Sequence, residues 1–191
     1  MNNQLIKQFV NLRPTGGFRV ILADPAVSFD NWSAKGEAKN AKAHYDCMSF
    51  EQIAKMPVGA LCADDCVLFL WVTWPTMPHW QEMITGWGFT FAGLAWEWRK
   101  YNPETGKSAL PDDLFGMGRA PAGVHSVRDW IEWWPEDEIR APRREHSRKP
   151  DEQYGRIETM FDGPYLELFA RQKRKGWSVW GNQTDKFGEV A

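Results

Sequence analysis

Cysteine is scarce in this sequence, and the few cysteines form no regular framework. The 191 residues contain three of them, Cys47, Cys62 and Cys66. An odd number without regular spacing excludes a disulfide scaffold and favours reduced thiols in a cytosolic protein. A zinc site would need a complete, well-placed ligand set, and the close cysteine pairs that usually provide one are absent. We therefore expect buried thiols and no metal site.

The sequence also lacks long apolar runs and a strong charge of either sign. No stretch approaches the roughly 18 apolar residues of a membrane span, and the segment Met1 to Val10 lacks the apolar centre of a secretory signal. We expect a cytoplasmic protein without membrane contact. The formal net charge is −2, so no global basic field attracts nucleic acid, and any such contact must come from a local patch.

What the sequence does contain is enough apolar material for one complete core. Apolar residues make up 43% and charged residues 25% of the chain, both in the range of globular proteins. The length predicts a single domain over residues 1–191, with no repeat or convincing internal boundary. Twelve tryptophans are present; we expect most of them in the core, while exposed ones could stack on bases.

Helix-like and strand-like segments alternate along the chain. Such alternation predicts an α/β domain with a mainly parallel sheet. Apolar spacing, capping residues and breakers predict helices at 5–12, 49–57, 78–87, 126–134 and 150–161. Apolar β-rich runs predict strands at 18–23, 66–72, 89–98, 165–170 and 177–180.

Two segments are expected to be irregular. Residues 28–45 are polar without a clear period, and we interpret them as a loop of a length that is often functional. Residues 101–124 are rich in proline and glycine, including Pro121 and Gly123, which predicts no regular element of useful length.

Asp24 and Pro25 follow the first predicted strand directly. A carboxylate and a proline-fixed carbonyl at a strand tip are two acceptors that could hold an amine, which has two donors. The alternative is an ordinary turn, which Asp and Pro also favour. An acid after an early strand and polar residues after late strands are typical of the ligand cleft of an open α/β sheet.

A basic segment and a polar cluster are the other candidates. The basic segment is either a phosphate-binding patch or a solvated loop that balances the acidic run before it, and its cations are Arg140, Arg143, Arg144, Arg148 and Lys149. Glu167 is an acid within an apolar strand, which a half-exposed strand would also explain. Asn182 and Gln183 follow Gly181; they are either part of a turn or donors and acceptors for a ribose or an amino-acid group.

Taken together, these motifs resemble the N(6)-adenine methyltransferases, the family that includes the catalytic subunit of the messenger-RNA adenosine methyltransferase. The chain looks like a short phage or bacterial member, and the resemblance covers about 18–98 and 126–187. It rests on Asp24-Pro25, His146 to Glu152, Leu166 to Arg171 and Trp180 to Gln183.

The resemblance implies a Rossmann-like methyltransferase fold in which the catalytic motif precedes the cofactor motif. It implies that Asp24 and the Pro25 carbonyl hold the adenine amine for attack on the methyl group of S-adenosylmethionine, which is catalysis by positioning and electrostatics. It places residues 28–45 over the target base. The implied cofactor-binding residues are Asp24, Lys149, Glu167, Arg171, Asn182 and Gln183, and the expected nucleic-acid contacts are Arg140, Arg143, Arg144 and Arg148.

The catalytic motif departs from the family pattern Asp-Pro-Pro-Trp, because this chain has Ala26 and Val27 after Asp24-Pro25. Base stacking on the missing aromatic ring is worth ~1–3 kcal/mol, so its loss predicts a rate lower by about one to several orders of magnitude. The segment 107–125 also looks shortened and replaced.

Three functions fit the sequence. The first is an adenine methyltransferase that acts on nucleic acid, with DNA favoured over RNA. The second is an inactive methyltransferase fold that binds nucleic acid or a partner protein. The third is a methyltransferase for a different small molecule, since loss of the tryptophan would open the pocket. The sequence leaves a homodimer open.

Overall fold

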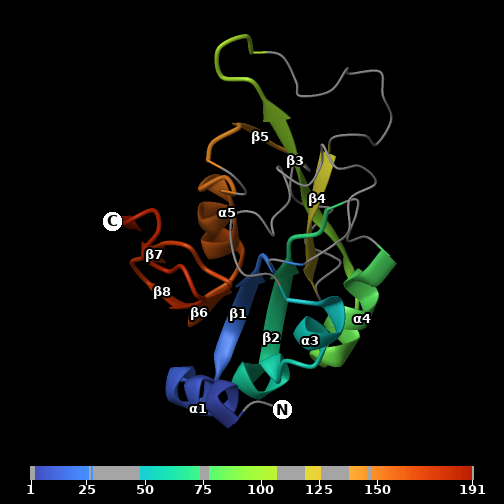
Figure 1. The fold of residues 1–191 in the computed structure, drawn as a ribbon, viewed down its shortest axis with the longest axis vertical. Coiled ribbons are helices and arrows are strands. Elements are labelled where there is room, and N and C mark those ends of the chain that lie inside the picture. The colour runs from blue at the N-terminus through green and yellow to red at the C-terminus, as the bar shows by residue number, and fades with distance from the viewer. Residues whose placement is uncertain are drawn as a thin grey trace.

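The central feature of the computed structural model is a parallel sheet (Figure 1). The structure describes residues 3–25, 27, 48–73, 78–106, 119–125, 138–145 and 148–190. The sheet has the order β2-β1-β6-β8, and each neighbouring pair is parallel. Its strands are β2 (Cys62–Leu70), β1 (Phe18–Ala23), β6 (Tyr165–Leu168) and β8 (Trp177–Trp180). The predicted α/β class with a parallel sheet is therefore confirmed.

A second sheet of three strands adjoins the first. Its order is β4 (Arg119–His125), β3 (Gly93–Tyr101) and β5 (Glu138–Pro142), with β3 antiparallel to β4 and parallel to β5. The backbone of β4 also runs close to β2, so the two sheets lie side by side. A final short pair joins β7 (Lys173–Arg174) to β9 (Glu189–Val190).

The expectation of no regular element in 101–124 was wrong, because β4 begins at Arg119. Pro121 pairs with Glu97, and Gly123 lies within the strand. Proline and glycine are unfavourable in strands, so the local sequence does not predict β4. Pairing with β3 stabilises this strand despite its low propensity. The strand β5 was missed for the same reason, because its five residues end in a proline.

The two faces of β1 pack into two different cores, as the alternation of a strand requires. Ile21 and Ala23 belong to one cluster, and Val20 and Leu22 belong to the other. The first cluster is covered by α1 (Asn3–Leu12), α3 (Phe50–Ala54), the 3-10 helix η2 (Val58–Leu61) and α4 (Trp80–Gly86). The second is closed by α5 (Glu152–Met160) and β3.

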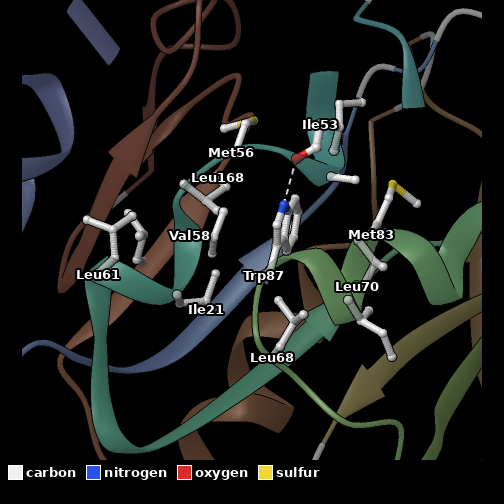
Figure 2. Close-up of a cluster of buried hydrophobic side chains, with 14 of the residues drawn as sticks. Ile21, Ile53, Met56, Val58, Leu61, Leu68, Leu70, Met83, Trp87 and Leu168 are labelled. Carbon is white, nitrogen blue, oxygen red and sulfur yellow. Dashed lines mark hydrogen bonds between the residues drawn. The ribbon is translucent and has the colours of Figure 1, made fainter. Parts of the chain in front are cut away.

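Tryptophan fills both clusters, as the composition predicted. In the first, Trp87 is 2% exposed and its indole nitrogen donates to the carbonyl of Ile53 at 2.7 Å (Figure 2). In the second, Trp96 and Trp98 come from β3. The capping box at Ser49 is also present, with reciprocal hydrogen bonds between Ser49 and Gln52.

Several predictions fall outside the residues that the structure describes. These are the loop at 28–45, the helix at 126–134 and the residues Ala26, Cys47, His146 and Ser147. Within the described part of the chain, the helices are all too short and too polar to cross a membrane.

Candidate active site

Four chain segments meet where the parallel strands end. Ala23 is paired with Leu70 and Leu168, and Leu168 is paired with Trp180. The residues that follow these strand ends therefore share one edge of the sheet, and Asp24 is among them. Ligands of open α/β sheets bind outside this carboxyl edge.

Asp24 is held by a lysine 125 positions away. The Lys149 ammonium donates to Oδ2 of Asp24 at 2.5 Å, and the two side chains are 11% and 26% exposed respectively. The same ammonium lies 5.3 Å from the ring centroid of Trp71, which is buried. Trp71 is fixed in turn by its indole N–H, which donates to Gln153 at 2.6 Å. The carboxylate is thus anchored yet still reachable from solvent.

Glu167 is a buried acid beside this pair. It is 9% exposed, which rules out the half-exposed strand that the sequence left open. The Tyr154 hydroxyl donates to Oε2 of Glu167 at 2.9 Å. Burial raises the pKa of Glu167 to about 7, against the opposing effect of the Tyr154 hydrogen bond, and the charge of Asp24 raises it further. Burial and the negative charge of Glu167 also raise the pKa of Tyr154.

A pocket opens between Asp24 and the chain after β6. Four of the six predicted cofactor residues line it: Asp24, Lys149, Glu167 and Arg171. Arg148, predicted to contact nucleic acid, lines it as well. The sequence analysis did not identify the remaining lining residues, which are Tyr154, Phe169, Gln172 and Phe187.

Asn182 and Gln183 do not line this pocket. Asn182 is exposed, and the half-buried Gln183 accepts a hydrogen bond from Lys186 at 3.2 Å. The structure leaves them just beyond Gly181, close to the pocket rim formed by the chain after β6. Their role remains a prediction.

The turn after β6 is built under steric constraint. Phe169 has a φ of 62°, a conformation that costs a non-glycine residue about 1–3 kcal/mol. Its ring meets Trp180 edge to face, with centroids 5.6 Å apart. A Cβ on Gly181 would lie 2.6 Å from the Ala170 carbonyl oxygen, so only glycine fits there. This close approach fixes the position of the pocket-lining turn.

Phe187 is the residue that sequence reasoning missed most clearly. Its ring centroid lies 5.0 Å from the guanidinium carbon of Arg148 and 5.1 Å from that of Arg171. Its backbone N–H donates to the Arg171 carbonyl at 3.1 Å, which ties the C-terminal segment to the pocket. The only available signal was an aromatic residue in an otherwise polar stretch.

The predicted basic segment divides into an inward and an outward part. Arg144 donates to Asp151 at 2.6 Å and to the Lys149 carbonyl, so it shapes the chain that carries Lys149. Arg148 lines the pocket. Arg140 and Arg143 are exposed.

This chain has Val27 at the position of the family's aromatic residue. Val27 is 4% exposed within the first core cluster and forms an isolated bridge with Met48. Its N–H donates to the Pro25 carbonyl at 3.0 Å. Val27 therefore packs inward, and its side chain is not presented to a base. The Pro25 oxygen keeps a second lone pair as an acceptor.

The pocket residues fit S-adenosylmethionine chemically. Nε of Arg148 is buried and has no hydrogen-bond partner in the described part of the chain, so the pocket offers an unused donor to an acceptor. The pocket suits a ligand that carries hydroxyl groups and charged groups of both signs, because it contains the Asp24 and Glu167 carboxylates and neighbouring cations. Phe169 and Phe187 add apolar surface for a ring.

An acid after the first strand, a polar pocket at the carboxyl edge and helices on both faces define a Rossmann-like methyltransferase. The MT-A70 family matches residues 18–183. The chain therefore belongs to the MT-A70 family, a family of S-adenosylmethionine-dependent methyltransferases, and the resemblance predicted from the motifs is confirmed.

Several methyltransferases are similar to this chain over nearly its whole length. Type II methyltransferase M.MunI of Mycoplasma sp is 28% identical, over 94% of this chain and 82% of that protein. Human N(6)-adenine-specific methyltransferase METTL4 is 27% identical, over 97% of this chain and 41% of that protein. The human N(6)-adenosine-methyltransferase catalytic subunit METTL3 is 29% identical, over 93% and 30%. The chain thus spans most of M.MunI but less than half of the METTL proteins.

Proposed function

We propose that this chain transfers a methyl group from S-adenosylmethionine to the exocyclic amine of adenine in nucleic acid, with DNA favoured over RNA. The observation that carries the proposal is Asp24, anchored by Lys149 at the tip of β1 and bordering the pocket. The adenine specificity named for METTL4 and METTL3 supports the choice of base. The match to 82% of the Mycoplasma type II methyltransferase M.MunI supports a methyltransferase of about this length, and the preference for DNA is the expectation from the sequence.

Asp24 and Pro25 hold the amine in this proposal. The Asp24 carboxylate and the Pro25 carbonyl accept the two N–H bonds of the amine, which orients its nitrogen lone pair away from the ring. Lys149 holds Asp24 in place, so no reorganisation is needed when charge develops on the amine nitrogen. S-adenosylmethionine, when bound, supplies the electrophilic methyl group.

The pocket residues bind the cofactor by complementary charge. Lys149 and Arg148 face its carboxylate, and Glu167 accepts from its hydroxyl groups. We assign Arg171, Asn182 and Gln183 to its ribose and adenine. Phe187, whose ring contacts Arg148 and Arg171, gives the adenine ring an aromatic neighbour.

A binding module without turnover is the second candidate, and one observation favours it. Val27 stands where the family has a base-stacking ring, and its side chain is buried in the core. Loss of stacking removes ~1–3 kcal/mol of base positioning. The pocket and the anchored Asp24 would still bind cofactor and substrate.

The decisive experiment measures transfer of labelled methyl groups to adenine. We would incubate the purified chain with labelled S-adenosylmethionine and with duplex DNA, single-stranded DNA or single-stranded RNA of one sequence. Asp24→Asn is the matched variant, because it keeps the shape of the side chain and removes its charge.

We expect label in the adenine of DNA and a loss of at least about a hundredfold in the variant. More label in RNA would overturn the DNA preference alone. No label at all, in a folded chain that still binds S-adenosylmethionine by calorimetry, would reject the enzyme and leave the binding module.

A further inference from the structure

The end of β3 carries a cation that the pocket does not use. Lys100 is the penultimate residue of this strand and is half-buried. Its ammonium lies over the ring of Trp98, 4.3 Å from the ring centroid. Among the carboxylates that the structure describes, none forms an ion pair with it.

Lys100 lies next to the anchored carboxylate. Trp98 and Trp71 meet edge to face, with centroids 6.1 Å apart. Lys149 is placed on Trp71 and contacts Asp24. One pair of indoles thus lies against two lysines: Lys149 is paired with Asp24, and Lys100 has no ion-pair partner among the described residues.

The charges around Lys100 favour an anion. Burial lowers the pKa of Lys100, and repulsion from Lys149 and Arg143 lowers it further, while Asp24 raises it. Two cations and one carboxylate therefore act on Lys100. A ligand with negative charge would relieve this repulsion, and it would bind Lys100 more strongly than in water because the site is partly desolvated.

The anion site lies outside the cofactor pocket. Lys149 lines that pocket, whereas Lys100 does not. In Figure 1, β3 continues past the carboxyl ends of β1 and β2, with β5 beside it, so its last residues extend beyond the edge of the parallel sheet.

One exposed arginine continues the positive charge from Lys100 beyond the end of β5. Arg143 follows this strand, and its charge acts on Lys100. Lys100 is in register with Ala141, whereas Arg140 is in register with Arg99 and therefore lies on the opposite face of the sheet. The Arg140 guanidinium lies 6.0 Å from the ring centroid of Tyr101, and the backbone N–H of Arg143 donates to the Tyr101 carbonyl at 3.0 Å. Cations with an interleaved aromatic ring are typical of nucleic-acid surfaces.

We propose that Lys100 binds a backbone phosphate of the nucleic acid next to the target nucleotide, and that Arg143 continues this phosphate contact beyond the end of β5. The inference rests on the proposed function for its substrate class. It assigns the substrate to the β3–β5 side of Asp24, opposite the cofactor. A lysine is suited to this role because its compact charge needs no fixed ligand geometry.

The test compares Lys100→Met with Lys100→Arg in binding experiments on the full chain. Methionine keeps an unbranched side chain and removes the charge, while arginine keeps the charge. Lys55→Met is the matched control, because Lys55 is a 71% exposed lysine on the C-cap of α3. The probe is a labelled single-stranded adenine-containing oligodeoxynucleotide, titrated by fluorescence anisotropy at several salt concentrations.

We expect Lys100→Met to weaken oligonucleotide binding about tenfold and to reduce the salt slope by about 0.7, the value of one phosphate contact on a single strand. Lys100→Arg and Lys55→Met should bind as the wild type does. S-adenosylmethionine affinity, measured by calorimetry, should be unchanged in all variants.

Wild-type affinity and salt slope in a folded Lys100→Met variant would overturn the proposal. Selective loss of S-adenosylmethionine affinity would also overturn it, because the anion would then be the cofactor carboxylate. Neither readout requires turnover. An inactive wild-type chain that shows the expected binding pattern would thus reject the proposed reaction and retain the phosphate site.

Discussion

At the scale of the residue, the site depends on how charges are compensated at the end of β1. Asp24 and Glu167 are both carboxylates of the pocket, but their surroundings differ. Asp24 has an ammonium at 2.5 Å, whereas Glu167 has a phenol and little solvent. Asp24 therefore has a direct cationic partner, whereas burial brings the pKa of Glu167 to about 7, so near that pH its charged and neutral forms are balanced.

The raised pKa of Glu167, about 7 against an ordinary 4.5, makes stability fall as pH rises. Between these two values the folded chain binds more protons than the unfolded chain, so the free energy of unfolding decreases with pH and then levels off. Relative to Glu167→Gln, the wild type should lose at most about 3 kcal/mol across this window. Denaturant unfolding of both proteins from pH 4.5 to 8 measures the difference. Parallel curves would contradict the raised pKa.

Sequence reasoning reached some of these residues and not others. The family motifs identified Asp24, Lys149 and Glu167, which all line the pocket. Phe187 and Lys100 were missed, because their neighbours come from distant parts of the chain. The inward packing of Val27 could not be seen either, since a valine after a strand fits a core or a surface equally well.

At the scale of the element, backbone geometry decides which glycines are needed. Gly181 is required where β8 ends, because the Ala170 carbonyl approaches its Cα. Gly155 lies within α5, is exposed, and leaves open space where a Cβ would be. The sequence has a glycine at both positions, but a Cβ would clash at position 181 and would meet open space at position 155.

Substitution of the two glycines by alanine should therefore have opposite effects. Gly155→Ala should raise the free energy of unfolding by about 0.5–1 kcal/mol, because glycine is a poor helix former. Gly181→Ala should lower it by about 1–3 kcal/mol and weaken S-adenosylmethionine binding, because the pocket turn must move. Urea unfolding and calorimetry provide both readouts. Equal effects at the two positions would show that the close approach at Gly181 is unimportant.

At the scale of the whole molecule, the second core joins the two sheets. Val20, Leu22 and Phe69 from the parallel sheet share this cluster with residues of β3 and α5. Phe69 stacks on Trp96 with ring centroids 5.2 Å apart. The β3–β5 side, which carries the proposed phosphate contact, is thus held to the sheet that carries Asp24.

The shared core predicts one cooperative unfolding transition. Trp98→Ala should lower the free energy of unfolding by about 3–5 kcal/mol, since a large side chain that is 3% exposed is removed. Tryptophan fluorescence and far-ultraviolet circular dichroism should give coincident curves in both proteins. Separate transitions would indicate that the two sheets unfold independently, against the expectation of a single domain.

The sequence by itself determined the local features of this protein. Apolar runs defined the buried strands of the parallel sheet, and the spacing of Tyr154 and Ile157 defined the buried face of α5. Asp24 followed from its place after β1, because strand direction alone puts it at the ligand edge.

Only the tertiary structure decided the rest, because the deciding contacts join distant parts of the chain. The strand β4 forms despite Pro121 because β3 pairs with it. Lys149 reaches Asp24 across 125 positions, and Lys100 is linked to the same site through two indoles that meet edge to face. No local pattern encodes such meetings, since each depends on which strands become neighbours and how their ends are aligned.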